Sequence, residues 1–255
     1  MDVIEVGSGP VPVVALHGIQ GTRAAWLPVA ARLRSLCTFV LPNLQGRGAA
    51  PRPDTAEGYT LERYAAAARA VVERHVGARP FVLAGWSMGV SVALEYADRY
   101  RYELRPAALL LLSGSPALCE TRWFRAGDDP ALLAEITERE RRLGLSEAAD
   151  HAAVAHTWRA IRHTDQRSRL PSLPMPALVV HGRDDDDCPW PHAQALADGL
   201  PAGRLATIER AGHGLLTGHA DTVAELALPW LRQLADAMHG AAAPLPPSSI
   251  PLELP

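Results

Sequence analysis

The chain contains no lysine, and its charge is nearly balanced. All 25 basic residues are arginine, 28 residues are acidic, and the formal net charge of the 255-residue chain is −3. A chain without excess positive charge has no long-range attraction to nucleic acid or to an anionic membrane surface. We therefore expect neither as a partner, and we assign the arginine bias no functional role.

Cysteine is scarce, and long apolar runs are absent. Cys37, Cys119 and Cys188 are widely spaced, odd in number and free of any C-x-x-C motif, which argues against a disulfide framework or a zinc knuckle and favours a reducing compartment. The strongest apolar run, 107–112, has the length of a strand and not of a membrane span. The first residues lack the basic and apolar pattern of a signal peptide. We expect a cytoplasmic protein.

Proline gathers near the end of the printed sequence, where the periodic apolar residues stop. The last regular apolar stripe ends near Leu234, and five prolines fall between Pro244 and Pro255. Such a composition favours an extended or disordered segment over a packed element. The sequence therefore predicts a Pro-rich tail over residues 240–255.

Elsewhere, short apolar runs alternate with apolar stripes of helical spacing. The runs that we expect to be strands are 3–6, 13–16, 38–41, 81–84, 109–113, 177–180 and 205–208. This alternation predicts an α/β protein with a mostly parallel sheet and helices on both of its faces. Residues 114–171 contain only helical stripes, so we expect a helical insertion between the core segments 1–113 and 172–239.

The segment after the apolar run 81–84 fits the pattern G-x-S-x-G. It consists of Gly85, Trp86, Ser87, Met88 and Gly89, and a helical stripe follows it. Between a strand and a helix, this pattern is typical of a nucleophile elbow. The turn is so tight that side chains two residues before and after the serine would collide, which explains both glycines. Ser87 is the predicted nucleophile, and the N–H of Met88 is placed to donate to a developing oxyanion.

A serine nucleophile needs a base, and the base needs a residue that orients it. Four consecutive aspartates, 184–187, follow the predicted strand 177–180, and His213 follows the predicted strand 205–208. Because the carboxyl ends of parallel strands meet at one edge of a sheet, these loops should lie near Ser87. The order Ser, Asp, His along the chain is the one found in hydrolases whose nucleophile lies on a G-x-S-x-G elbow.

The four aspartates have a second interpretation, since carboxylates also bind calcium or magnesium. Adjacent carboxylates on one loop cannot all converge on one ion, and the sequence lacks the alternating ligands of an EF-hand. We therefore expect no metal ion. Asp184, Asp186 and Asp187 are expected to be solvated.

Taken in order along the chain, these motifs resemble the α/β-hydrolase fold, in its cap-bearing esterase and lipase-like branch. Four segments within residues 3–236 carry the resemblance: 17–19 is similar to an oxyanion loop, 42–48 to D-x-P-G-x-G-x-S, 182–189 to G-x-x-D-x-x-x-P, and 212–213 to the terminal G-H. Asn43 stands where the family usually has aspartate, and Ala49 lies close to where it usually has serine.

The resemblance implies a catalytic triad. Ser87 would be the nucleophile, and His213 would act first as general base and then as general acid to the leaving group. Asp185, at the aspartate position of G-x-x-D-x-x-x-P, would orient His213 and stabilise its imidazolium.

The resemblance also implies an oxyanion hole and a pocket. The N–H groups of Ile19 and Met88 would bind the oxyanion. Gln20 and Trp86, which neighbour them in the sequence, would shape the substrate pocket.

The insertion 114–171 would then form a helical cap over the catalytic edge. It has more apolar residues than two short helices need for their own packing, so some should face Ser87 and line an apolar pocket. We expect Trp123 or Trp158 to contact the substrate; the alternative is that all of them seal the cap against the core. The charge run 138–142 is expected to face solvent.

These expectations lead to a serine hydrolase that cleaves a carboxylic ester or thioester of a hydrophobic small molecule through an acyl-enzyme, without a cofactor. Serine at the elbow argues against the haloalkane dehalogenases and epoxide hydrolases of this fold, which have aspartate there. Three alternatives stay open, because a fold does not fix a substrate. They are a thioesterase or acyl transferase acting on carrier-bound acyl chains, a C–C bond hydrolase, and a ligand-binding protein with little or no turnover.

Overall fold

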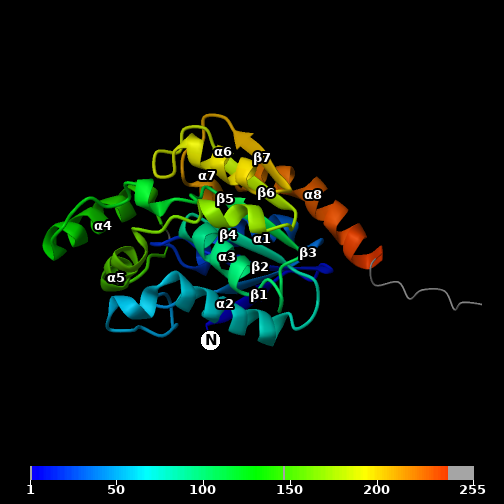
Figure 1. Ribbon diagram of the computed structural model, residues 1–255, viewed down its shortest axis with the longest axis horizontal. Coiled ribbons are helices and arrows are strands. Elements are labelled where there is room, and N and C mark those ends of the chain that lie inside the picture. Colours follow the sequence, from blue (N-terminus) through cyan, green and yellow to red (C-terminus); the bar gives the residue numbers. More distant parts are fainter. Residues whose placement is uncertain (1, 146, 241–255) are drawn as a thin grey trace, which may run out of the picture.

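A single sheet organises the chain. The computed structural model describes residues 2–145 and 147–240, and within them seven strands form one sheet in the order β1-β3-β2-β4-β5-β6-β7 (Figure 1). The strands are β1 Val3–Val6, β2 Val11–Leu16, β3 Cys37–Pro42, β4 Val82–Trp86, β5 Ala108–Leu112, β6 Ala177–Gly182 and β7 Gly203–Ile208. β1 pairs antiparallel with β3, and all other neighbours are parallel. Each strand lies within two residues of its predicted position, and the predicted mostly parallel sheet is confirmed.

Helices connect the strands. The α-helices are α1 Leu27–Leu33, α2 Leu61–His75, α3 Met88–Arg99, α4 Asp129–Leu143, α5 His151–Ile161, α6 Trp190–Gly199, α7 Leu215–Gly218 and α8 Ala220–Gly240. The 3-10 helices are η1 Arg23–Trp26, η2 Ala56–Tyr59, η3 Leu118–Glu120 and η4 Arg167–Ser172. Among helices built from the described residues, none is long and apolar enough to cross a membrane.

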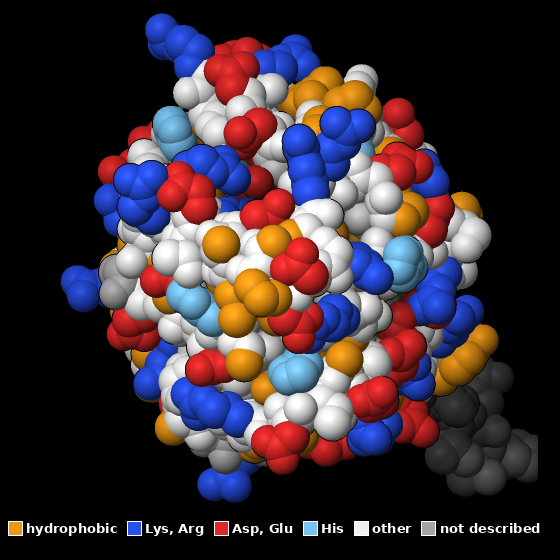
Figure 2. Space-filling model, turned by 90° about the vertical axis from the view of Figure 1, so that its left-hand side faces the viewer, with side chains coloured by type: hydrophobic (Ala, Val, Ile, Leu, Met, Phe, Trp, Pro, Cys, Tyr) orange, Lys and Arg blue, Asp and Glu red, His pale blue; other side chains and the backbone are white. Residues whose placement is uncertain are grey.

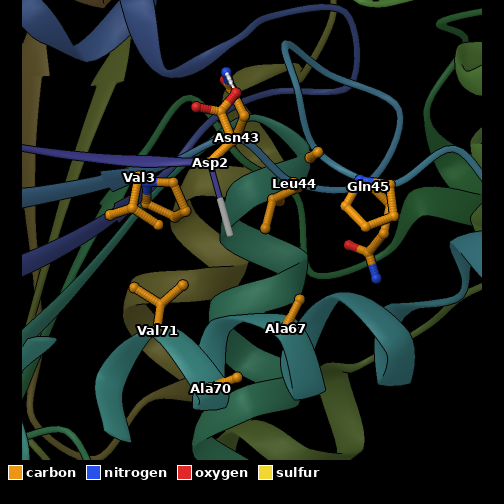
Figure 3. Close-up of a pocket in the computed structure, with 11 residues that line it drawn as sticks. Asp2, Val3, Asn43, Leu44, Gln45, Ala67, Ala70 and Val71 are labelled. Atoms are coloured by element: carbon orange, nitrogen blue, oxygen red, sulfur yellow. Dashed lines mark hydrogen bonds between the residues drawn. The ribbon is translucent and has the colours of Figure 1, made fainter. Parts of the chain in front are cut away.

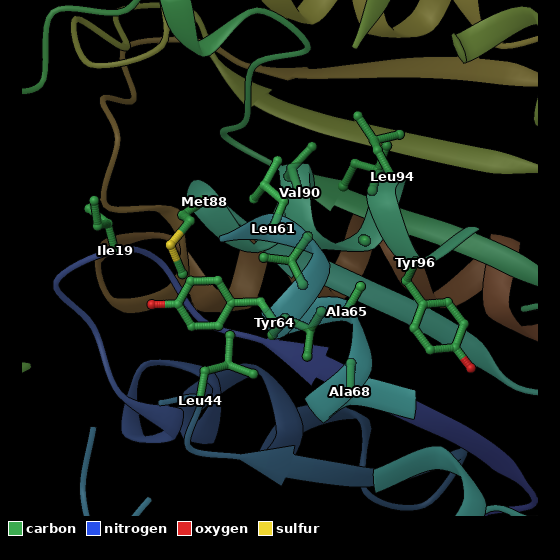
Figure 4. Close-up of a cluster of buried hydrophobic side chains, with 14 of the residues drawn as sticks. Ile19, Leu44, Leu61, Tyr64, Ala65, Ala68, Met88, Val90, Leu94 and Tyr96 are labelled. Carbon is green, nitrogen blue, oxygen red and sulfur yellow. The ribbon is translucent and has the colours of Figure 1, made fainter. Parts of the chain in front are cut away.

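Both faces of the sheet are buried, because successive strand side chains point into two different apolar cores. Leu109 and Leu111 of β5 belong to the core that α2, α3 and α6 cover, whereas Leu110 and Leu112 belong to the core under α1 and α8. Figure 4 shows part of the first core, in which Tyr64 of α2 lies beside Met88 of α3.

The segment between β5 and β6 contains α4 and α5, which lie to one side of the sheet in Figure 1. Asp128 and Asp150 cap these helices, accepting from the N–H groups of Ala131 and Ala153 at 2.9 and 3.0 Å. α4 ends at Leu143, and the next residue, Gly144, has a φ of 56°, which glycine adopts without strain. The division into a core and a cap over 114–171 stays a prediction.

The structure differs from the sequence-based expectation at two helices. After Thr22, the residues Trp26, Val29, Ala30 and Leu33 have the spacing of a single helix. The structure divides this stretch into η1 and α1, because Pro28 has no N–H and so favours a new helix start. The final helix, α8, extends to Gly240. The rest of the predicted tail, 241–255, lies outside the described residues.

The face of the molecule on the side of α4 and α5 carries mixed charge. Figure 2 shows acidic and basic side chains interspersed over this face, with small apolar areas between them. Such mixing fits the near balance of charge in the sequence.

Candidate active site

Ser87 lies at a strained corner between β4 and α3. Its φ of 58° and ψ of −121° place it in a region that residues other than glycine rarely adopt. A Cβ on Gly85 would lie 2.3 Å from the Gly89 carbonyl oxygen, and a Cβ on Gly89 would lie 2.3 Å from the Leu16 carbonyl oxygen. Close backbone packing therefore explains both glycines of the G-x-S-x-G pattern.

Three side chains from different loops form one hydrogen-bonded chain. Ser87 Oγ lies 2.9 Å from His213 Nε2, and His213 Nδ1 lies 3.0 and 3.1 Å from the two carboxylate oxygens of Asp185. Asp185 follows β6 and His213 follows β7, so the parallel strands bring both loops to the edge where β4 ends. A carboxylate only accepts hydrogen bonds, so Nδ1 carries the proton and Nε2 presents a lone pair to the serine hydroxyl.

The loop after β6 keeps Asp185 ionised. Its Oδ1 accepts from the N–H groups of Asp187 at 3.0 Å and Cys188 at 2.8 Å. Burial by itself raises the pKa of this carboxyl, but His213, His181 and the Cys188 N–H together outweigh burial, and the pKa lies below its ordinary value. An ionised carboxylate is the form that can orient an imidazole and stabilise its protonated state.

Trp86 supports the loop that carries His213. Its Nε1–H donates to the His213 carbonyl at 3.1 Å, and the two ring centroids are 5.5 Å apart. The structure thus gives this buried side chain a contact with His213, while its contact with substrate stays a prediction.

The loop 17–21 approaches the serine closely. A Cβ on Gly18 would lie 3.1 Å from the Cβ of Ser87. Within residues 2–145 and 147–240, the N–H of the buried Ile19 has no acceptor, and such groups are rare in folded proteins. Met88 begins α3, where first-turn N–H groups lack partners inside the helix. These are the two predicted oxyanion donors, and their role stays a prediction.

His17 fixes one of the peptides in this loop. Its Nε2 accepts from the Leu44 N–H at 3.0 Å, so its Nδ1 carries the proton and donates to the Gly18 carbonyl at 2.9 Å. Burial, reinforced by the charge of Arg47, lowers the pKa of His17 to about 3. His17 is therefore neutral at pH 7, and it polarises the peptide that carries the Ile19 N–H.

Known proteins share this sequence pattern. A family model described as "Alpha/beta hydrolase family" matches residues 13–226. The chain belongs to this family. The predicted fold and the predicted enzyme class, a hydrolase, are confirmed.

Relatives of this hydrolase carry several names. The Pimeloyl-[acyl-carrier protein] methyl ester esterase of Aromatoleum aromaticum is 27% identical over 256 residues, covering 84% of this chain and 95% of that protein. The Putative carbamate hydrolase RutD of Cronobacter turicensis is 27% identical over 241 residues, covering 82% and 88%. An esterase from Exiguobacterium antarcticum superposes with a TM-score of 0.77 at 23% identity, covering 90% and 94%. That structural likeness shows the fold.

The loop after β3 departs from the family pattern at Asn43. The Asn43 Oδ1 accepts from the Arg23 N–H at 2.8 Å, and its Nδ2 donates to the Asp2 carboxylate at 2.8 Å. Asp2 also accepts from the Ala49 N–H at 2.7 Å and pairs with Arg23. Asp2 thus supplies a carboxylate beside Asn43, the position at which the resemblance leads one to expect aspartate. Figure 3 shows Asp2 and Asn43 together at a mostly apolar pocket between this loop and α2, which the triad does not line.

Gln20 bonds to the segment between β5 and β6. Its Nε2 donates to the Ile136 carbonyl at 2.8 Å, its Oε1 accepts from Arg139 at 2.6 Å, and its carbonyl accepts from the Ala149 N–H at 2.9 Å. The polar atoms of its side chain are therefore occupied by α4. A role for Gln20 in the substrate pocket stays a prediction.

Two expectations about charged residues are wrong. Arg139, inside the charge run 138–142, is 5% exposed, and Asp187 is also 5% exposed, although both were expected to be solvated. The Arg139 guanidinium lies 2.9 Å from the Asp187 carboxylate, and Arg142 lies 2.8 Å from it. Burial raises the pKa of Asp187, but Arg139, His213 and Arg142 together outweigh burial, and the pKa falls to about 2. Mutual neutralisation explains why both charges are buried.

Trp123 and Trp158 lie in one aromatic cluster. Their ring centroids are 5.6 Å apart, and Phe124 lies 5.7 Å from Trp158. The Trp123 Nε1–H donates to the Asp187 carbonyl at 3.0 Å. This bond places the ring against the loop of aspartates 184–187 after β6, which we call the acid loop. Both tryptophans are buried, and their contact with substrate stays a prediction.

Metal-ligating side chains and the thiol of Cys188 are the other groups that could do chemistry. Within residues 2–145 and 147–240, no group of three His, Cys, Asp or Glu side chains is arranged to hold a metal ion. Cys188 is buried, and burial raises the pKa of its thiol well above the ordinary value, which leaves it unreactive.

Sequence reasoning missed Arg139, Asp187 and Arg47 as buried groups. Each belongs to a polar stretch, and each has at least one partner far away in the sequence. The spacing could have revealed Arg139, because it falls on the same face of α4 as the apolar residues Leu132 and Ile136.

Proposed function

We propose that the protein is a serine hydrolase that cleaves a carboxylic ester or thioester bond of a hydrophobic small molecule through an acyl-enzyme. The observation that carries this proposal is the chain from Ser87 through His213 to Asp185 at a strained strand–helix corner. An imidazole nitrogen 2.9 Å from a serine hydroxyl, backed by a carboxylate, activates that serine as a nucleophile.

Acylation would use all three side chains. Ser87 Oγ attacks the substrate carbonyl carbon while its proton passes to His213 Nε2, and Asp185 stabilises the resulting imidazolium. The carbonyl oxygen becomes an oxyanion, which would accept from the N–H groups of Ile19 and Met88. When this intermediate collapses, the C–O or C–S bond breaks and His213 gives its proton to the leaving alcohol or thiol.

Deacylation repeats these steps with water. The water oxygen bonds to the acyl carbon of the acyl-enzyme while His213 takes a proton from the water. Ser87 Oγ then leaves and takes that proton back, which releases a carboxylic acid and restores the starting enzyme. No cofactor enters either half of the reaction.

The buried aromatic cluster supports an apolar substrate. Trp123 lies against the acid loop through its bond to the Asp187 carbonyl, and it packs on Trp158. Since Ser87 is 1% exposed, substrate entry requires side chains or the helices α4 and α5 to move. We infer that an acyl chain or alcohol group enters between these helices and the triad.

A carrier-bound acyl chain is one form of such a substrate. Relatives at 25 to 27% identity are named pimeloyl-[acyl-carrier protein] methyl ester esterases, which act on an acyl chain held by a carrier protein according to that name. Kinetics on matched free and carrier-bound esters would decide whether this protein uses a carrier. Equal kcat/KM for the two forms would argue against a carrier partner.

Covalent labelling tests the proposal directly. A fluorophosphonate should label the wild-type protein at Ser87 and leave Ser87→Ala unlabelled, because only a serine activated by His213 reacts. Ser91 and Ser115 are the internal controls, since both are buried serines close to the same edge of the sheet. An adduct found on either of them by mass spectrometry would overturn the assignment.

Turnover separates the remaining alternatives. The wild-type protein should hydrolyse p-nitrophenyl esters, and Trp123→Ala or Trp158→Ala should change kcat/KM by different factors for short and long acyl chains, because lost contact area scales with chain length. Labelling without turnover on any ester or thioester would favour a C–C bond hydrolase or a binding protein. Acyl transfer to an added alcohol in place of water would favour a transferase.

A further inference from the structure

Arg47, in the loop after β3, is a fully buried cation. It is 0% exposed, and every acceptor that residues 2–145 and 147–240 offer its guanidinium is a neutral oxygen. Nη1 donates to the Gln45 carbonyl at 2.6 Å and to the Tyr64 hydroxyl at 2.7 Å, and Nη2 donates to the Ile19 carbonyl. Its Nε finds no acceptor in the part of the chain that the structure describes. A buried charge without a counter-ion is unfavourable, so a neutral side chain would serve better if packing alone mattered.

The guanidinium is held where three parts of the chain meet. Thr157 of α5 lies 3.4 Å from Nη1 and 2.7 Å from the Tyr64 hydroxyl. The guanidinium carbon lies 5.7 Å from the centroid of the Tyr64 ring. In Figure 4 the Tyr64 hydroxyl points to the side of the core on which Ile19 lies, and Met88 lies next to the ring. These contacts fix the guanidinium before any substrate arrives.

The bond from Arg47 ends on the residue that carries a predicted oxyanion donor. His17 donates to the Gly18 carbonyl and Arg47 donates to the Ile19 carbonyl, so both peptides that flank the Ile19 Cα are held by hydrogen bonds. A positive charge without a counter-ion, in a site closed to water, favours negative charge that develops near it. Arg47 therefore combines a fixed loop geometry with a favourable field.

We propose that Arg47 is a positioning residue of the oxyanion hole: it holds the Ile19 carbonyl, on the peptide that follows the one with the Ile19 N–H, and places a buried positive charge next to the loop that binds the oxyanion. This role rests on the proposed serine hydrolase function. It assigns to the second variable position of the D-x-P-G-x-G-x-S-like loop a part in transition-state stabilisation.

The test compares kinetics with the affinity for a transition-state analogue. Arg47→Met keeps much of the side-chain volume and removes the charge. Its kcat on a p-nitrophenyl ester should fall about 10- to 100-fold, less than the largest losses seen when an oxyanion donor itself is removed, with KM changed less than about threefold. Ser87 Oγ adds to the carbonyl carbon of a trifluoromethyl ketone, its proton passes to His213, and the ketone oxygen becomes an oxyanion. Its inhibition constant should rise by about the same factor as kcat/KM falls.

Thr157→Val is the matched control. It removes one contact of Arg47 but leaves the charge and the bond from Arg47 to Ile19, so it should lower Tm and change kcat and the inhibition constant less than Arg47→Met does. Arg47→Lys serves if Arg47→Met does not fold, because it keeps the charge but not the planar, two-armed geometry. Arg47→Lys should raise the inhibition constant of the ketone and lower kcat by matching factors. Both changes should be smaller than those caused by Arg47→Met.

The outcomes are distinct. A folded Arg47 variant with unchanged ketone affinity, or with a loss confined to Tm, would overturn the role of Arg47. A wild-type protein that neither hydrolyses esters nor reacts with a fluorophosphonate would overturn the proposed function instead.

Discussion

Two aspartates of the acid loop, only two residues apart, have different partners. Asp185 accepts from His213, whereas Asp187 accepts from arginines of α4. Asp185→Asn should lower kcat on a p-nitrophenyl ester about 10⁴-fold, because an amide favours the wrong tautomer of His213 and does not stabilise its imidazolium.

Neighbouring aspartates provide matched controls for that substitution. Asp184 and Asp186 are exposed, so Asp184→Asn and Asp186→Asn should leave kcat close to the wild-type value. If either proved as damaging as Asp185→Asn, the family alignment of this loop would be wrong by a residue.

His17 should make stability depend on pH. Burial and the charge of Arg47 lower its pKa to about 3, while in the unfolded chain the pKa is about 6.5. The unfolded state therefore binds a proton first as pH falls. The resulting stability is fully present above pH 6.5 and is lost between pH 6.5 and 3, at up to about 1.4 kcal/mol per pH unit.

His17→Asn keeps a donor and an acceptor but cannot titrate in this range. Urea unfolding at several pH values should therefore give a shallower decline for the variant than for the wild type. Parallel declines for the two proteins would contradict a neutral, buried His17.

Local motifs predicted the triad because each member has a characteristic neighbour. Glycines flank Ser87 and precede His213, and a proline follows Asp185 at the family spacing. Asp187 lacks such a neighbour. Its partner Arg139 lies 48 residues away, and nothing local tells a paired carboxylate from a solvated one. The sequence therefore picked out the aspartate that contacts His213 and misplaced the next buried one.

At the scale of elements, α4 is attached to the acid loop by a buried ion pair. Arg139 and Asp187 are both 5% exposed. Asp187→Asn would leave the buried Arg139 charge without a carboxylate, which should lower the free energy of unfolding by about 3 kcal/mol. Chemical unfolding followed by tryptophan fluorescence measures this loss, because Trp123 contacts the same loop.

The same helix carries a control pair. Arg141 and Glu138 are exposed and 2.8 Å apart, so Arg141→Met should change the unfolding midpoint little. Equal effects from the buried and the exposed pair would show that burial does not set the strength of this attachment.

Periodicity predicted the helices α4 and α5 but not what their faces touch. An apolar stripe shows that a face is buried, and it does not name the surface against which that face packs. Thus the stripe of α4 places Ile136 on a buried face. The bond that its carbonyl accepts from Gln20 depends on tertiary geometry alone.

For the whole molecule, the apolar residues of α4 and α5 are continuous with one core of the sheet. Ile136 is 0% exposed and belongs to the same cluster as Met88. Ile136→Ala should therefore destabilise the entire protein by about 2 to 5 kcal/mol, since a cavity opens in a shared core. Calorimetry should show one transition at a lower Tm.

Leu133, a more exposed leucine of the same helix, is the control for this continuity. It is 39% exposed, so Leu133→Ala should shift Tm far less. Two separate transitions in Ile136→Ala would show instead that α4 and α5 unfold apart from the sheet.

The sheet was predictable because its strands are buried on both faces and so form unbroken apolar runs, as in β5. The direction of β1 was not, since a four-residue strand carries no mark of parallel or antiparallel pairing. The near-complete burial of Ser87 also lay beyond the sequence, because it depends on how closely distant segments approach.

The hydrogen bonds of Gln20 limit how segments can be exchanged between relatives to change substrate preference. The helical segment 114–171 holds the body of the protein through Gln20 on one loop and Asp187 on another. A graft of that segment alone would arrive without the groups that its own backbone and arginines need. The unit to exchange is therefore three separate pieces of chain, and a recombination library that breaks only at residues 114 and 171 should yield mostly inactive chimeras.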